Sequence, residues 1–161
     1  MIKSFYTDIL QNGPSFHSVL PIKSLDLLFP AFRTAVEAVL DEAKKAGHPM
    51  MVFETFRSTD RQIELYKQHL TELKNVGVHH YGLAADICFL DSSGTPSWKG
   101  DFTLLGKFAK NQNLVWGGDW GHPEKPHTFR DWDHVQFISV ADQNKLFDGS
   151  WYPDENYKVE G

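Results

Sequence analysis

The chain has 161 residues, which suits one domain with a substantial core, and a formal net charge of −5. A composition of 41% hydrophobic and 23% charged residues excludes disordered and collagen-like chains, and the acidic balance argues against nucleic acid or an anionic membrane surface as partner. The single cysteine, Cys88, excludes an internal disulfide, and no apolar run approaches the ~18 residues of a membrane span.

The first elements predicted along the chain are two helices separated by a strand. A helix is predicted over 31–46, because apolar residues recur there at helical spacing and Pro30 stands at its start. The apolar run at 50–53 predicts a short buried strand. A capping-box pattern beginning at Thr59 then predicts a helix as far as about Leu70.

The middle of the chain alternates loops with further elements. Residues 71–78 are polar and predict a loop, and the apolar run at 83–89 predicts a strand. A helix is predicted over 101–113, with its apolar residues on one face. Residues 115–131 are rich in Gly, Pro and Trp and predict a loop too long for a mere connector, before a strand over 134–138.

Helices and short strands are mixed without βαβ regularity, so we expect an α+β fold: a small antiparallel sheet flanked by helices, in a single domain over 1–161. A short helix is predicted to begin near Ser139, and the polar C-terminus from Ser150 is expected to be loosely held. The N-terminus lacks the apolar stretch of a signal peptide, so we expect a soluble protein made in the cytoplasm.

Asp86 is the unusual residue of the predicted strand over 83–89. A carboxylate in an apolar run is costly to bury unless it is paired. Strand alternation puts Asp86 on one face between two small residues, Ala84 and Cys88, and the other face is core. His79 lies just across a Tyr-Gly turn and can fold back toward Asp86. An imidazole and a carboxylate together suit Zn²⁺.

A catalytic zinc normally has three protein ligands, and the best third candidate is His134 in the sequence RDWDHVQF. Asp131 and Asp133, in the same stretch, could each supply the base that a zinc-bound water needs. The helical HExxH signature of other zinc proteases does not occur in the sequence. Taken alone, Asp86 could instead pair with a buried arginine or accept hydrogen bonds from backbone amides.

These residues resemble a known family. The pattern H-x-x-G-x-A-x-D from His79 to Asp86, followed downstream by D-x-x-H from Asp131 to His134, resembles the zinc D-Ala-D-Ala carboxypeptidases and dipeptidases, the VanY-like family. It resembles still more that family's phage L-alanyl-D-glutamate endopeptidases, which are endolysins. The stretches FETFRSTDRQIELY and LVWGGDW are similar to family segments as well, so the resemblance covers about residues 50–138.

The resemblance implies a role for each of five residues. His79, Asp86 and His134 would be the zinc ligands. Asp131 would be the base that deprotonates zinc-bound water and later protonates the leaving amine; strand alternation allows this only if the chain bends before the strand that begins near His134. Arg57 would stabilise the oxyanion formed at the scissile carbonyl.

Several neighbouring residues carry weaker expectations. Gly77 stands where the family usually has a serine, which affects support around the metal more than metal binding itself. His80 is interpreted as a loop histidine. Trp116, His127 and Trp132 are candidates for substrate binding, although aromatic residues in such places are more often packing and a loop histidine is as often solvated.

By this resemblance the protein is a zinc metallopeptidase. We expect it to hydrolyse a peptide bond in bacterial peptidoglycan stem peptides, most of all L-Ala-D-Glu, as a phage or prophage lysis enzyme released through a membrane hole. The expected partner is the stem peptide, with no nucleic acid or membrane, and the expected state is a monomer. The alternatives are a D-Ala-D-Ala carboxypeptidase or dipeptidase on the same scaffold, and a non-catalytic, zinc-containing wall-binding module.

Overall fold

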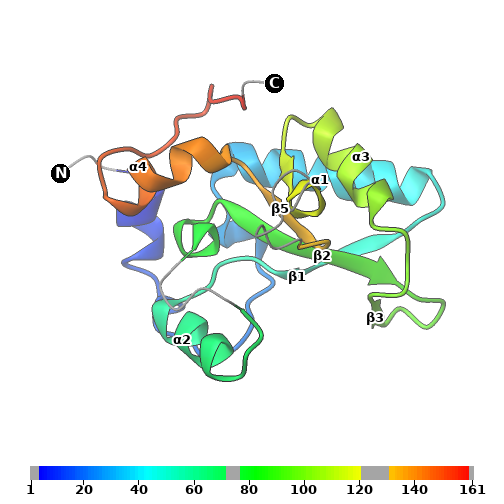
Figure 1. The fold of residues 1–161 in the computed structure, drawn as a ribbon, viewed down its shortest axis with the longest axis horizontal. Coiled ribbons are helices and arrows are strands. Elements are labelled where there is room, and N and C mark those ends of the chain that lie inside the picture. The colour runs from blue at the N-terminus through cyan, green and yellow to red at the C-terminus, as the bar shows by residue number, and fades with distance from the viewer. Residues whose placement is uncertain (1–3, 72–76, 121–130, 160–161) are drawn as a thin grey trace.

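A twisted antiparallel sheet forms the middle of the molecule in the computed structural model, which describes residues 4–71, 77–120 and 131–159 (Figure 1). Within these residues the strands follow the order β1-β2-β5-β4, and β3 pairs with β2. The strands are β1 Met50–Glu54, β2 Ala84–Leu90, β3 Pro96–Ser97, β4 Val115–Trp116 and β5 His134–Gln136. The predicted α+β fold with an antiparallel sheet is confirmed.

The helices are α1 Pro30–Lys45, α2 Thr59–Lys67, α3 Thr103–Asn111 and α4 Gln143–Phe147. α1 and α3 pack against each other, with α1 against β1 and α3 against β4 (Figure 1). The apolar stripe of α1, which includes Phe32, Val36 and Val39, shares one core cluster with Ala85 and Ile87 of β2. Because side chains alternate along a strand, Asp86 lies on the opposite face of β2 from Ala85 and Ile87.

The helix predicted over 31–46 is confirmed as α1, and the helix predicted from Thr59 begins there as α2 but ends at Lys67. Its cap was misassigned by one residue. Ser58 has the extended backbone of an N-cap, and its hydroxyl accepts a hydrogen bond from the Arg61 amide at 2.9 Å. The helix stops before the predicted Leu70 because His69 adopts a left-handed backbone with φ of 58°.

The other predicted helices and strands keep their type but change in length, and one predicted loop contains a strand. Residues 115–131 were predicted to be a loop throughout, but Val115 and Trp116 form β4 because they pair in register with Gln136 and Val135 of β5. The remainder of that segment from 121 to 130, like 72–76 of the predicted polar loop, lies outside the described residues. The predicted third helix is shorter, as α3, and the strand predicted over 134–138 ends at Gln136.

The expectation of a loosely held C-terminus was wrong for the described part. Trp151, Tyr152 and Tyr157 pack against the core. The Tyr152 hydroxyl donates to the Tyr81 carbonyl at 2.8 Å, and the Tyr157 hydroxyl donates to Asp142 at 2.7 Å. Although many residues of this stretch are polar, its aromatic side chains hold it against the core. In the described part of the chain, no helix has the length and apolar character needed to cross a bilayer.

Candidate active site

Three buried polar residues lie side by side on neighbouring strands of the sheet. The pairing of β1 with β2 puts Glu54 opposite Asp86, and the pairing of β2 with β5 puts Asp86 opposite His134. All three side chains are buried, and Glu54 is only 2% exposed. His134 Nδ1 lies 3.7 Å from Asp86 Oδ1. Backbone hydrogen bonding of the sheet therefore sets the spacing between Asp86 and His134.

His79 reaches the same place from a turn. It lies in the 3-10 helix Val78–Tyr81, which ends at Gly82 in the left-handed region with φ of 72°. A Cβ at Gly82 would lie 2.8 Å from the Leu27 carbonyl oxygen, so the turn needs glycine for space as well as for its backbone conformation. His79 Nε2 lies 3.3 Å from Asp86 Oδ1. The structure thus brings the three predicted ligands together, with their ligand atoms within 4.8 Å of one another.

The outward nitrogen of each histidine is anchored. His79 Nδ1 bonds to the Thr55 carbonyl at 2.8 Å, and since a carbonyl only accepts, this nitrogen carries the hydrogen. His134 Nε2 lies 2.8 Å from Gln136 Oε1. The Gln136 side-chain amide nitrogen donates to the Ile138 carbonyl. This bond orients the Gln136 side chain so that its oxygen faces His134. When both rings are neutral, the inner nitrogens, His79 Nε2 and His134 Nδ1, carry lone pairs on the side of the site where Asp86 lies. Metal-binding imidazoles are arranged in this way, with the outer nitrogen hydrogen-bonded and the inner one free to bind the metal.

Arg57 also reaches this site, from the loop between β1 and α2. Its guanidinium lies 3.1 Å from Asp86 Oδ2 and also donates to Glu54, with Nε to Glu54 Oε1 at 2.7 Å. Asp86 therefore combines features of both sequence interpretations: one oxygen faces the histidines and the other faces a partly buried arginine. Glu54, which also accepts from Arg61 at 3.1 Å, was missed because the predicted strand ended one residue before it. An acidic residue directly after an apolar strand was the available signal.

The chain bends before β5, as the D-x-x-H spacing required. β5 begins only at His134, whose amide donates to the Asp131 carbonyl at 3.3 Å in a turn. Asp131 and Asp133 both place a carboxylate oxygen within 4.8 Å of Asp86. Their surroundings differ: Asp131 is partly exposed with Oδ2 3.9 Å from His134 Nδ1, whereas Asp133 Oδ2 accepts from the Trp98 indole at 3.1 Å.

The charges of these groups are strongly coupled. Burial alone would raise the pKa of Asp86, but His79, the hydrogen bond to His134 and the Arg57 charge hold that pKa well below its ordinary range. Burial, the Asp86 charge and a hydrogen bond with Asp131 raise the pKa of Asp133 to about 9. Crowded carboxylates beside two imidazole lone pairs form a donor set that fits a divalent cation, and nitrogen with oxygen ligands suits Zn²⁺.

The remaining candidates lie in different surroundings. Trp116 is 5% exposed, with its ring against Gly106 and Gly118, so the structure places it in the core rather than on a surface that a substrate reaches. His80, expected to be a loop histidine, is buried and hydrogen-bonded through both nitrogens, which corrects that interpretation. His127 lies outside the described residues.

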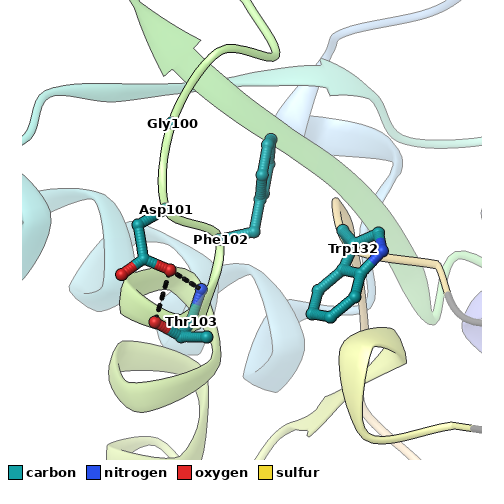
Figure 2. Close-up of a pocket in the computed structure, with 5 residues that line it drawn as sticks. All are labelled: Gly100, Asp101, Phe102, Thr103 and Trp132. Atoms are coloured by element: carbon teal, nitrogen blue, oxygen red, sulfur yellow. Dashed lines mark hydrogen bonds between the residues drawn. The ribbon is translucent and has the colours of Figure 1, made fainter.

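Trp132 is 43% exposed and lines a pocket of about 340 Å³. Figure 2 shows its ring across from Phe102 and the start of α3, where Asp101 bonds to Thr103. The pocket is lined by Gly100, Asp101, Phe102, Thr103 and Trp132. None of the three predicted metal ligands lines it, so this hollow is separate from the ligand cluster.

The ring that does cover the ligand cluster belongs to Trp120. Its centroid lies 4.9 Å from that of His134. Its indole nitrogen is buried and has no hydrogen-bond partner among the described residues. A tilted aromatic contact of this kind limits the positions that the His134 ring can adopt.

Comparison with known proteins supplies the family. Residues 71–130 match a peptidase M15 family model described as D-alanyl-D-alanine carboxypeptidase. The chain is 30% identical over 129 residues to the peptidoglycan L-alanyl-D-glutamate endopeptidase CwlK of Bacillus subtilis strain 168, across 69% of this chain and 74% of that protein.

Solved structures share the fold. The Serratia marcescens L-Ala D-Glu endopeptidase ChiX matches with a TM-score of 0.57 and 22% identity, covering 73% of this chain and 87% of that one. A mutant of the vancomycin-resistance D,D-pentapeptidase VanY in complex with Zn(II) matches with a TM-score of 0.56 and 15% identity, covering 84% and 87%. With 30% identity to CwlK over more than two thirds of both chains, this protein belongs to the peptidase M15 family and is a peptidase.

Proposed function

We propose that this peptidase works with a zinc ion held by His79, Asp86 and His134. The observation that carries the proposal is the convergence of two imidazole nitrogens and one carboxylate oxygen within 4.8 Å. The anchored outer nitrogens support it, because they leave a lone pair on each inner nitrogen. When bound, zinc would polarise the scissile carbonyl and make water a stronger nucleophile near neutral pH.

Asp131 is the proposed general base. It is partly exposed beside His134, where a water and a substrate can approach it. It takes a proton from the attacking water and returns it to the leaving amine. Asp133 suits this task less well, because burial and the neighbouring carboxylates raise the pKa of its carboxyl and the Trp98 indole donates to one of its oxygens.

Arg57 is the proposed oxyanion-stabilising group. Its guanidinium cation already lies against Asp86 at the ligand cluster. Glu54 and Gln62 hold the other guanidinium nitrogens, so a substrate carbonyl would meet a cation fixed in place. Because such a charge is already in place, little free energy is needed to reorganise the site during the reaction.

The proposed substrate is the peptidoglycan stem peptide, cut between L-Ala and D-Glu. The names of CwlK and ChiX support this bond. A role in phage or prophage lysis belongs to the same proposal and rests on the likeness of the sequence to phage endopeptidases. The second candidate, removal of a terminal D-Ala, is favoured by the description of the matching family model.

Digestion of purified peptidoglycan by the zinc-loaded enzyme tests the proposal. Mass spectrometry of the products should show new D-Glu amino termini, and the Asp131→Asn variant should release almost none. Release of free D-Ala without D-Glu termini would support the second candidate instead. An enzyme that holds zinc but yields neither product would contradict both.

A further inference from the structure

The N-terminal segment, residues 4–18, packs on the turn that carries His79. Phe5 and Leu10 lie against Gly82, each 3.1 Å from the position that a Cβ there would take. The centroid of the Tyr6 ring lies 4.7 Å from that of the Tyr81 ring and 5.3 Å from that of the His80 ring. This segment lies outside residues 50–138, which the family motifs span.

His80 joins this segment to the loop that carries Arg57. The His80 side chain is 4% exposed, and both ring nitrogens are used. Nδ1 lies 3.1 Å from the Arg57 carbonyl oxygen, which can only accept, so Nδ1 carries the hydrogen. In the neutral ring Nε2 is then the acceptor, and the Tyr6 hydroxyl donates to it at 2.7 Å. The hydrogen bonds run from Tyr6 through His80 to the Arg57 backbone.

The Arg57 backbone is thereby held at both of its polar atoms. Its amide donates to the His79 carbonyl at 3.3 Å, and its carbonyl accepts from His80. The next residue, Ser58, donates from its hydroxyl to the Ser18 carbonyl, so the N-terminal segment contacts the loop a second time. A guanidinium that stabilises a developing charge must be placed within about 0.5 Å.

We propose that Tyr6 is a positioning residue, which sets the place of Arg57 in the active site through His80. The proposal rests on the proposed function only in taking Arg57 to act in peptide hydrolysis. It does not depend on which stem-peptide bond is cut. A segment outside the shared motifs would then contribute to turnover without touching the substrate.

The test is a double-mutant cycle on zinc-loaded enzyme, with kcat and KM measured at steady state and long incubations for the slow variants. Tyr6→Phe keeps the ring and removes only the hydroxyl. We expect kcat to fall about fivefold, which corresponds to the net worth of one hydrogen bond, with KM and zinc content unchanged. In an Arg57→Ala background, Tyr6→Phe should cause no further loss, because its effect passes through Arg57.

Tyr152→Phe is the matched control. Its hydroxyl bonds the same turn through the Tyr81 carbonyl but has no bond to the Arg57 loop. This variant should lose a similar amount of thermal stability and keep the wild-type kcat. The proposal is overturned by an unchanged kcat in Tyr6→Phe, by an equal loss in the Arg57→Ala background, or by an equal loss in Tyr152→Phe. Failure of the proposed function would appear separately, as wild-type enzyme that cuts no stem-peptide bond.

Discussion

The proposed active site has two halves that are built differently. Asp86 and His134 belong to the sheet, where the register of β2 and β5 places them side by side. His79 and Arg57 belong to a turn and a loop, held by bonds to backbone carbonyls and by the packing of the N-terminal segment. Backbone ladders fix the first half, and individual side chains fix the second.

This difference decides where the site tolerates change. A strand pair keeps its geometry through many backbone hydrogen bonds, so one lost side chain leaves the others in place. In the loop half, the backbone of Arg57 and the ring of His79 are each placed by single hydrogen bonds, worth about 0.5–1.5 kcal/mol apiece. We therefore expect variants in the loop half to alter the placement of groups, and variants in the sheet half to alter mainly the group replaced.

Removing a ligand from either half should have the largest effect. His79→Ala and His134→Ala should each lose most of the bound zinc and essentially all turnover, because each leaves only two ligands. Metal analysis of the purified variants measures this. His48→Ala, at an exposed histidine, is the control and should keep its zinc. Full zinc retention in both ligand variants would remove these residues from the metal site.

The next largest effect on turnover should come from Asp131, the first of the two aspartates before β5. Asp131→Asn should lower turnover by on the order of 10²–10⁴ with zinc still bound, because the general base is lost. Asp133→Asn should cost much less, since the oxygen of an amide can still accept the hydrogen bond from the Trp98 indole. Zinc content and turnover are measured for both. A zinc-loaded, inactive Asp133→Asn beside an active Asp131→Asn would reverse the assignment.

Arg57 tests the loop half directly. Arg57→Ala should lower kcat by ~10²–10³, the usual result of losing one oxyanion-stabilising group. The fold should persist, because Arg61 still pairs with the buried Glu54. Arg61→Ala, which removes the other partner of Glu54, is the matched control and should keep most of its turnover. An Arg57→Ala enzyme within about threefold of wild type would exclude Arg57 from the reaction.

Prediction from the sequence was more successful for the sheet half than for the loop half. Alternation along 83–89 placed Asp86 on the strand face opposite the core residues, and the D-x-x-H spacing required the bend that the structure shows before His134. No local sequence pattern predicts the hydrogen bond between Tyr6 and His80, which lie 74 residues apart, or the one by which the Thr55 carbonyl orients His79. Such contacts depend on how loops pack, which periodicity does not encode.

The short strand β4 and the C-terminal aromatics were missed for a related reason. Val115 and Trp116 are too few to show alternation, and they form a strand only because β5 offers an edge with which they can pair. Trp151, Tyr152 and Tyr157 lie in a stretch with many polar residues, so composition suggested a loose tail. Tertiary contacts override local preference in both places.

Within the sheet half, the smallest effect should come from Gln136, the residue that orients His134. Gln136 is fully buried, and its oxygen accepts from His134 while its nitrogen donates to the Ile138 carbonyl and to Gln143 at 2.9 Å. In Gln136→Leu the His134 ring loses the partner that keeps its hydrogen on Nε2, and Nδ1 presents its lone pair to the metal less often. Loss of such a partner typically weakens metal affinity 10- to 100-fold.

Zinc titration against a competing chelator measures this effect, and thermal unfolding of the metal-free protein measures the separate cost in stability. Gln143→Leu is the graded control. It removes one of the two acceptors that orient the Gln136 amide and leaves the bond to Ile138, so zinc affinity should fall by less than in Gln136→Leu. If Gln136→Leu bound zinc as tightly as wild type, the sheet alone would suffice to orient His134. The two halves of the site would then differ even more than their hydrogen bonds suggest, with side-chain support confined to the loop half.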